Sequence, residues 1–271
     1  MNQKIIFLDL DGTLLNDRKE ITPGNRAAID HALAAGHKVV IATGRPLVSA
    51  VQQAEKLDLT TPGCYLIAFN GGILYDMGRR EILFQETISL DLVRQVFAEA
   101  NRRGMHIQTY NDRDVLVEPR CDGAAVRRYC DLIHMEYQVI PSVEAVTEEP
   151  VKMLLIDRED RAPLEAFRDW VIDWSDGALD SFFSSPYYLE IVRKGLNKGN
   201  AIRQMCALLG IPIENSCAVG DADNDLPMLR AAHVGAAMAN ATAEVKAAGN
   251  YITQRDNNHD GVAEVIERFL L

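Results

Sequence analysis

The sequence predicts an α/β protein with a Rossmann-like parallel sheet core and an inserted α+β domain. Three observations support this fold class. Short apolar runs alternate with amphipathic helical segments up to about residue 84, and the same alternation resumes at Lys198. Strand–helix–strand order of this kind favours a parallel sheet with right-handed crossovers. Between these two stretches, strands follow one another across short turns, which is typical of antiparallel pairing.

The N-terminal elements follow in a regular order. The apolar run Ile5–Leu8 fits a strand that is covered on both faces of a parallel sheet. Thr22 and Pro23 are typical of a helix start, with proline at the first helical position, and Gly36 is typical of its end. The later elements of this stretch are predicted at residues 39–42 (strand), 46–57 (helix), 65–69 (strand), 70–72 (turn) and 73–75 with 82–84 (hairpin).

The pattern changes after residue 84. Ser89 is placed to cap a helix whose apolar residues recur at helical spacing up to Gly104. Strands at 105–110 and 115–117 are separated only by a polar turn, so we expect them to be antiparallel. Further elements are predicted at 122–137 (helix), 151–156 (strand), 164–174 (helix), 181–183 (strand) and 188–192 (strand). Residues 85–188 are therefore expected to form the inserted α+β domain.

The C-terminal part returns to the first pattern and completes the core. Its elements are predicted at 201–209 (helix), 217–219 (strand), 225–232 (helix), 234–236 (strand), 242–248 (helix), 251–252 (strand) and 261–270 (helix). The expected core is thus discontinuous and consists of residues 1–84 and 189–271.

Composition limits the classes of function. The chain has 271 residues, of which 48% are hydrophobic, so it can bury a sizeable core. Its net charge of −11 disfavours nucleic acid as a partner, although a small phosphorylated metabolite can bind where the site supplies local positive charge. The five cysteines form no C-x-x-C pair and are expected to be reduced. Neither a signal peptide nor an apolar run of the ~20 residues that a membrane span needs is evident, so we expect a cytoplasmic protein without membrane contact. The oligomeric state stays open.

Polar side chains follow the apolar runs at four places. In an open parallel sheet, ligands bind beyond the carboxyl ends of the strands, so these places should lie at one edge of the sheet. Carboxylates, one hydroxyl, one ammonium and several backbone N–H groups would meet there, as a phosphoryl-transfer site requires. The four segments are Asp9-Leu10-Asp11-Gly12-Thr13, Thr43-Gly44-Arg45, Asn197-Lys198-Gly199 and Gly220-Asp221-Ala222-Asp223-Asn224-Asp225.

Each segment taken alone also has an ordinary structural explanation. The D-x-D-G run could be a polar loop, and the acidic run from Asp221 could cap a helix N-terminus. Thr43 could be a turn hydroxyl, and Lys198 a solvated charge. Only their common order and their positions at predicted element ends favour the functional interpretation.

With these four motifs the sequence resembles the haloacid dehalogenase-like (HAD) hydrolase superfamily, and within it the Cof-type sugar-phosphatase branch with its inserted α+β cap. The first segment matches the hallmark D-x-D-G-T-L, and the other three match the second, third and fourth motifs in order and spacing. The motif positions show no departure from the family pattern. The resemblance covers the whole chain, including the position of the cap.

The resemblance implies a role for each motif residue. Asp9 would attack phosphorus to form an aspartyl-phosphate, and Asp11 would act as general acid and then as general base. Mg²⁺ would be held by the Asp9 carboxylate, the Asp11 main-chain carbonyl and Asp221. The phosphoryl oxygens would be held by Leu10, Thr43, Gly44, Lys198 and Asn224. Cations are needed because the repulsion between Asp9 and a phosphate at ~4 Å amounts to several kcal/mol at an effective dielectric constant of ~20. For Asp223 and Asp225, support of Asp221 and helix capping both stay open.

The expected function is Mg²⁺-dependent hydrolysis of small phosphate monoesters, most simply sugar phosphates. Phosphosugar mutase activity and a non-catalytic phosphoacceptor or ligand sensor are the alternatives. A dinucleotide-binding oxidoreductase is disfavoured because no G-x-G-x-x-G opens the first helix. The cap is expected to select the substrate. Its candidate contact residues, together with one from the core, are Arg45, His106, Tyr110, Arg113, Tyr187 and Tyr188.

Overall fold

The computed structural model describes residues 3–121 and 123–271, and it divides into two compact units. The first, which we call the core unit, consists of the chain up to Arg45 together with Ala50–Phe84 and Asn197–Leu271. The second, the cap unit, consists of Gln85–Leu196 and the short segment Pro46–Ser49. The α/β fold class predicted from the sequence is confirmed.

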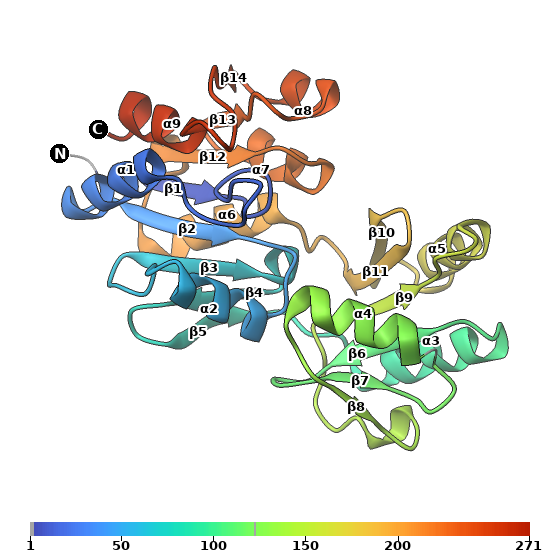
Figure 1. The fold of residues 1–271 in the computed structure, drawn as a ribbon. Coiled ribbons are helices and arrows are strands. Elements are labelled where there is room, and N and C mark those ends of the chain that lie inside the picture. Colours follow the sequence, from blue (N-terminus) through green and yellow to red (C-terminus); the bar gives the residue numbers. More distant parts are fainter. Residues whose placement is uncertain (1–2, 122) are drawn as a thin grey trace. The chain divides into compact units, whose positions relative to one another are not determined.

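The core unit is built on an eight-stranded sheet with the strand order β14-β13-β12-β1-β2-β3-β4-β5 (Figure 1). Helices α1 and α9 pack against each other, as do α6 and α7. The strands are β1 (Ile5–Leu8), β2 (Lys38–Ala42), β3 (Cys64–Ala68), β4 (Ile73–Asp76), β5 (Glu81–Gln85), β12 (Ser216–Gly220), β13 (Val234–Ala237) and β14 (Tyr251–Ile252). The helices are α1 (Pro23–Ala34), α2 (Leu47–Lys56), α6 (Lys198–Leu209), α7 (Leu226–Ala231), α8 (Ala243–Ala248) and α9 (Gly261–Phe269).

The register of the central strands determines where the motifs lie. Strand β1 is parallel to both β12 and β2, and Leu8 is paired with Val219 on one side and with Ile41 on the other. Strand β2 is in turn parallel to β3. All residues of β1 and β12 are buried, as expected for strands that are covered on both faces. The carboxyl ends of these four strands therefore lie along one edge of the sheet.

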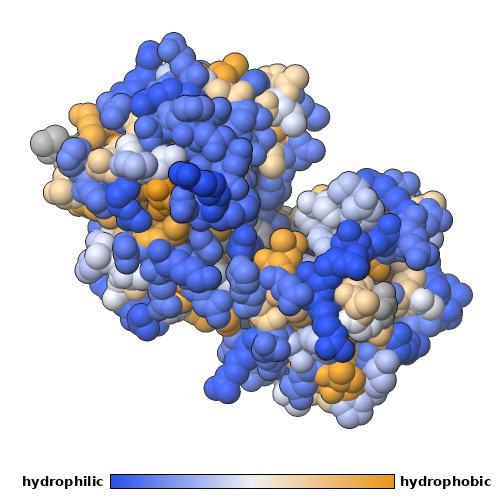
Figure 2. Space-filling view, viewed as in Figure 1, coloured by the Kyte–Doolittle hydropathy of each residue, from blue (hydrophilic) through white to orange (hydrophobic). Residues whose placement is uncertain are grey.

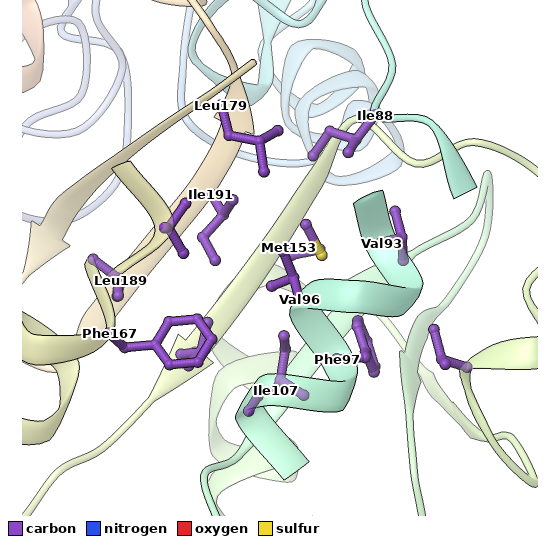
Figure 3. Packing of buried hydrophobic residues seen from close by; sticks show 14 of the residues in the cluster. Ile88, Val93, Val96, Phe97, Ile107, Met153, Phe167, Leu179, Leu189 and Ile191 are labelled. Carbon is purple, nitrogen blue, oxygen red and sulfur yellow. The ribbon is translucent and has the colours of Figure 1, made fainter. Parts of the chain in front are cut away.

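The cap unit is built on a six-stranded sheet with the order β10-β11-β9-β6-β7-β8. Its strands are β6 (Ile107–Tyr110), β7 (Val115–Val117), β8 (Tyr137–Val139), β9 (Lys152–Ile156), β10 (Leu179–Ser185) and β11 (Tyr188–Arg193), and its helices are α3 (Leu90–Arg102), α4 (Gly123–Ile133) and α5 (Ala162–Trp174). Strands β6 and β7 are antiparallel, as predicted. Buried apolar side chains of α3, among them Val96 and Phe97, pack with Met153 and Ile107 of the sheet (Figure 3). The cap unit therefore has a hydrophobic core of its own.

Two predicted boundaries in the cap unit differ from the structure. The helix expected at 122–137 ends at Ile133, because His134 adopts a left-handed conformation, and Tyr137–Val139 instead form the edge strand β8. The expected start of that helix, Asp122, lies outside the described residues. Strand β11 pairs with β9 and β10, so the cap sheet extends to Arg193 rather than ending at the expected residue 188.

The view in Figure 2 shows mostly hydrophilic side chains, with hydrophobic residues in small separate groups. Within the described part of the chain, none of the helices combines the length and the apolar character needed to cross a membrane.

Candidate active site

The nucleophile predicted from the sequence lies where β1 ends. The Asp9 backbone N–H donates to the carbonyl of Val219 on β12 at 3.0 Å, so β1 stays paired up to this residue. The chain then turns at Gly12, whose φ of +88° is in the left-handed region. Asp9 is only 7% exposed, so its carboxylate is largely buried at the end of the strand.

Lys198 joins two of the carboxylates in this site. Its ammonium lies 2.5 Å from Asp9 Oδ1 and 2.6 Å from Asp225 Oδ1, and the whole side chain is buried. Asn197 caps helix α6 by accepting the N–H of Asn200, and this cap sets the position of Lys198 in the first turn. A buried ammonium is stable only when it is paired, so Lys198 is part of the site rather than a solvated charge.

Burial and like charges perturb the ionisation of this group of residues. Burial, followed by the nearby Asp225 carboxylate, raises the pKa of Asp9 from 3.8 to about 8, although Lys198 opposes this shift. Burial alone would lower the pKa of Lys198, but Asp225 and Asp9 outweigh it and raise that pKa. Burial also raises the pKa of Asp221, while the Thr13 hydroxyl opposes the shift. One ammonium thus faces more carboxylate charge than it can neutralise.

Asp221 is held against the loop that follows β1. The hydroxyl of Thr13 donates to Asp221 Oδ1 at 2.6 Å. A Cβ at position 12 would lie 2.5 Å from Asp221 Oδ2, so a larger residue there would displace this carboxylate. Asp9, Asp221 and Asp225 offer carboxylate oxygens that all lie within 4.8 Å of one another. Hard oxygen donors with excess negative charge fit a divalent cation such as Mg²⁺.

Asp225 has a larger role than the sequence indicated. Its Oδ2 accepts the backbone N–H groups of Asp221 and Ala222 at 3.0 and 3.1 Å, and its Oδ1 accepts from Lys198. It therefore caps the turn before α7 and fixes Asp221 at the same time. Both roles considered for Asp225, helix capping and support of Asp221, thus apply. Asp223 is exposed. The buried pairing could not be read from the sequence because Lys198 lies 27 residues away.

The predicted phosphate-binding residues lie at neighbouring strand and helix ends. Leu10 is buried directly after Asp9, and Thr43 and Gly44 follow β2. The Thr43 hydroxyl accepts the N–H of Arg45 at 3.2 Å. Asn224 lies in the turn that precedes α7, where its amide contacts Asn70. A role for Asn70 was not apparent in the sequence, where it was assigned only to a turn.

Asp11 is held by two cations. Lys19 lies 2.8 Å from Asp11 Oδ1, and the Arg45 guanidinium lies 3.0 Å from Oδ2. Burial alone would raise the pKa of Asp11, but Lys19 and then Arg45 outweigh it and lower that pKa. Asp11 is thus held as a carboxylate. Arg45, one of the candidate contacts to the substrate, contacts this carboxylate.

The candidate residues of the cap unit do not form one group. Tyr110 is buried, and its hydroxyl lies 2.6 Å from that of Tyr129, which packs edge-on against Tyr188. Gln108 lies 3.1 Å from His106 and donates to the Tyr110 hydroxyl at 3.3 Å, so His106, Tyr110 and Tyr188 belong to one connected group. The two remaining candidates lie outside this group. These two are Arg113, at a separate cavity of about 420 Å³, and Tyr187, which is exposed beside Arg158.

Comparison with known proteins agrees with this geometry. The sequence profile of the haloacid dehalogenase-like hydrolases matches residues 6–266. A 5-amino-6-(5-phospho-D-ribitylamino)uracil phosphatase of Bacillus subtilis is 31% identical, with 98% of this chain and 97% of the relative covered. A pyridoxal phosphate phosphatase of Escherichia coli is 30% identical over the full length of both chains. A crystal structure of a haloacid dehalogenase-like hydrolase from Bacteroides thetaiotaomicron has a TM-score of 0.88 at 31% identity, with 98% and 99% coverage.

The chain therefore belongs to the haloacid dehalogenase-like hydrolase family. Both the predicted superfamily and its Cof-type branch are confirmed, and the chain is an enzyme of the phosphatase type.

Proposed function

We propose that this protein hydrolyses small phosphate monoesters, in particular sugar phosphates, in a Mg²⁺-dependent reaction that passes through a phosphorylated Asp9. The observation that carries the proposal is the group of Asp9, Lys198, Asp221 and Asp225 at the carboxyl edge of the sheet, of which all but the half-buried Asp221 are buried. It combines a nucleophilic carboxylate, a cation for the phosphate and a set of oxygen donors for a divalent metal.

The metal would be held by the Asp9 carboxylate, the Asp11 main-chain carbonyl and Asp221. When bound, Mg²⁺ would supply positive charge that offsets the repulsion between a carboxylate and a phosphate dianion. Asp225 has both oxygens engaged by Lys198 and by backbone N–H groups, so we assign it to orienting Asp221 rather than to direct ligation.

In the first step, Asp9 attacks phosphorus, and the bond from phosphorus to the sugar oxygen breaks as Asp11 donates a proton to that oxygen, so the sugar leaves as an alcohol. Lys198, the Thr43 hydroxyl, Asn224 and the N–H groups of Leu10 and Gly44 bind the phosphoryl oxygens. In the second step, water attacks the phosphorylated Asp9, with Asp11 accepting its proton. Asp11 must carry a proton in the first step, so its contacts with Lys19 and Arg45 have to loosen when a substrate binds.

The substrate class rests on the relatives and on the insert. One relative acts on a phosphorylated ribityl compound and another on pyridoxal phosphate, both small phosphate monoesters. The cap unit, expected at 85–188, is proposed to select among leaving groups. A cytoplasmic location is part of the proposal, because all five cysteines are free thiols.

Phosphosugar mutase activity is the second candidate, because the same phosphorylated aspartate could return its phosphate to the sugar. Product analysis with a hexose 1-phosphate separates the two reactions: a hydrolase yields free hexose and phosphate, whereas a mutase yields the isomeric hexose phosphate. A phosphoacceptor or sensor would convert the hexose 1-phosphate by neither reaction.

The direct experiment is a phosphate-release screen over sugar phosphates and other phosphometabolites, with Mg²⁺ and with EDTA. The proposal expects Mg²⁺-dependent release that is highest with sugar phosphates, and no release from Asp9→Asn. Full activity in EDTA would refute the metal requirement, and activity confined to other phosphate esters would refute the substrate class.

A further inference from the structure

The turn after β3 has an unusual backbone. Three consecutive residues have left-handed φ values: Phe69 at 51°, Asn70 at 56° and Gly71 at +120°. A phenylalanine is rarely found in this region, because its Cβ approaches the following carbonyl oxygen. Such a turn persists only when its surroundings hold it in place, and strained turns of this kind are concentrated at functional sites.

Backbone contacts show what holds the turn. The N–H groups of Phe69 and Asn70 donate to the carbonyls of Arg45 and Thr43 at 2.9 and 3.0 Å. The turn is therefore bonded to the segment that follows β2.

The same turn also lies against the start of α6. A Cβ on Gly71 would lie 2.8 Å from the carbonyl of Asn197, the residue immediately before Lys198. The turn thus contacts two of the segments proposed to bind phosphate, the one that follows β2 and the start of α6.

The side chain of Asn70 extends this arrangement to a third segment. Its Oδ1 accepts from Asn224 Nδ2 at 3.4 Å, and its Nδ2 would lie 3.1 Å from a Cβ on Gly44. Asn70 is 4% exposed. Glycine would adopt the same backbone without burying an amide, which is costly unless the amide is hydrogen-bonded. The turn alone therefore does not explain the asparagine.

We propose that Asn70 is a positioning residue for phosphate binding, which acts by holding the amide of Asn224 and by packing over Gly44. The inference rests on the proposed function of this site, because it takes Asn224 and Gly44 to be groups that bind phosphoryl oxygens. Asn70 itself need not touch the substrate. Its loss should weaken the binding of any phosphate group regardless of the leaving group.

The test uses Asn70→Gly, which keeps the left-handed backbone and removes only the side chain. We expect kcat/KM to fall by ~10–100-fold, by the same factor for p-nitrophenyl phosphate and for a sugar phosphate. Binding of inorganic phosphate with Mg²⁺, measured by calorimetry, should weaken as well. Asp58→Gly is the matched control, because Asp58 is also left-handed but exposed, and it should leave both quantities unchanged.

A double-mutant cycle tests whether Asn70 acts through Asn224. In an Asn224→Ala background, Asn70→Gly should cause a smaller loss than it does in the wild type, because only the packing over Gly44 is then still removed. The inference is wrong if the Asn70→Gly protein binds phosphate and turns over substrate like the wild type. It is also wrong if Asn70→Gly lowers phosphate affinity and kcat/KM by the same factor with and without Asn224→Ala. Phosphate binding that depends on Asn70 in a protein without turnover would refute the proposed function but not this inference.

Discussion

At the scale of single residues, the site is dominated by excess negative charge around one buried ammonium. Asp9, Asp221 and Asp225 surround Lys198, and burial raises the pKa of Asp9 to about 8. Without a metal, a proton on Asp9 therefore offsets part of the charge. A divalent cation would take over this role, so metal binding and proton release should be linked.

This linkage has a measurable effect on stability. In the metal-free protein, folded Asp9 keeps its proton up to about pH 8, whereas the unfolded chain releases it near 3.8. Between these values the folded state binds more protons, so this part of the stability falls as the pH rises. We expect Asp9→Asn to remove that slope. The measurement is the free energy of unfolding in EDTA from about pH 5 to about pH 9. Parallel curves for the two proteins would contradict the raised pKa.

At the scale of elements, the loop from Asp9 to Thr13 aligns the carboxylates only if position 12 carries no side chain. Gly12→Ala would place a Cβ 2.5 Å from Asp221 at a φ of +88°. Gly36 has a φ of +85° but, among the described residues, no atom within 4 Å of its Cβ position. Gly36→Ala is therefore a control with the same backbone strain, ~1–3 kcal/mol.

We expect both variants to lose stability, Gly12→Ala by more because of its contact with Asp221, and to differ in metal dependence. Gly12→Ala should raise the Mg²⁺ concentration for half-maximal activity by ~10-fold or more, because Asp221 is displaced. Gly36→Ala should leave it unchanged. Titrations of activity with Mg²⁺, paired with thermal unfolding, make the comparison. Equal metal dependence in both variants would mean that the contact of Gly12 with Asp221 has no functional role.

Sequence patterns were sufficient for the elements that are long or fully buried. Strands such as β1 are continuous apolar runs, and helices such as α6 have apolar positions at helical spacing. Strand β8 was missed because it is an edge strand of only three residues, two of them exposed, which is too short for a periodic pattern to identify. The left-handed His134, which ends α4, has no signal in the sequence comparable to glycine.

The same distinction applies to the site. The positions of Asp9, Thr43, Lys198 and Asp221 at element ends could be predicted because parallel strands share one edge. The contacts of Asp225 with Lys198 and of Lys19 with Asp11 depend on side-chain directions that spacing does not determine. The role of Asn70 could not be predicted for another reason, because an Asn-Gly pair is an ordinary turn sequence.

At the scale of the whole molecule, the chain joins a core unit that holds the carboxylate site to a cap unit with a separate hydrophobic core. If the cap selects the leaving group, removing residues 86–195 should leave weak hydrolysis of p-nitrophenyl phosphate. The ratio of kcat/KM values across several sugar phosphates should then approach one. Retained turnover of p-nitrophenyl phosphate is the control for an intact site. An unchanged ratio would rule out selection by the cap.

In the proposed mechanism, phosphate is transferred to Asp9 before water removes it. Asp11→Asn should slow the second step more than the first when p-nitrophenyl phosphate is the substrate, because nitrophenolate leaves without a proton whereas water needs a base. With a sugar phosphate the same variant should be slower than the wild type by ~10²–10⁴.

The most direct measurement is a rapid-quench reaction of Asp11→Asn with Mg²⁺ and p-nitrophenyl phosphate, followed by mass spectrometry of the peptide that contains Asp9. This mechanism predicts a burst of nitrophenolate and a phosphorylated peptide with the phosphate on Asp9, both absent from a doubly substituted protein that also carries Asp9→Asn. Release of nitrophenolate without a burst and without phosphate on Asp9 would contradict it.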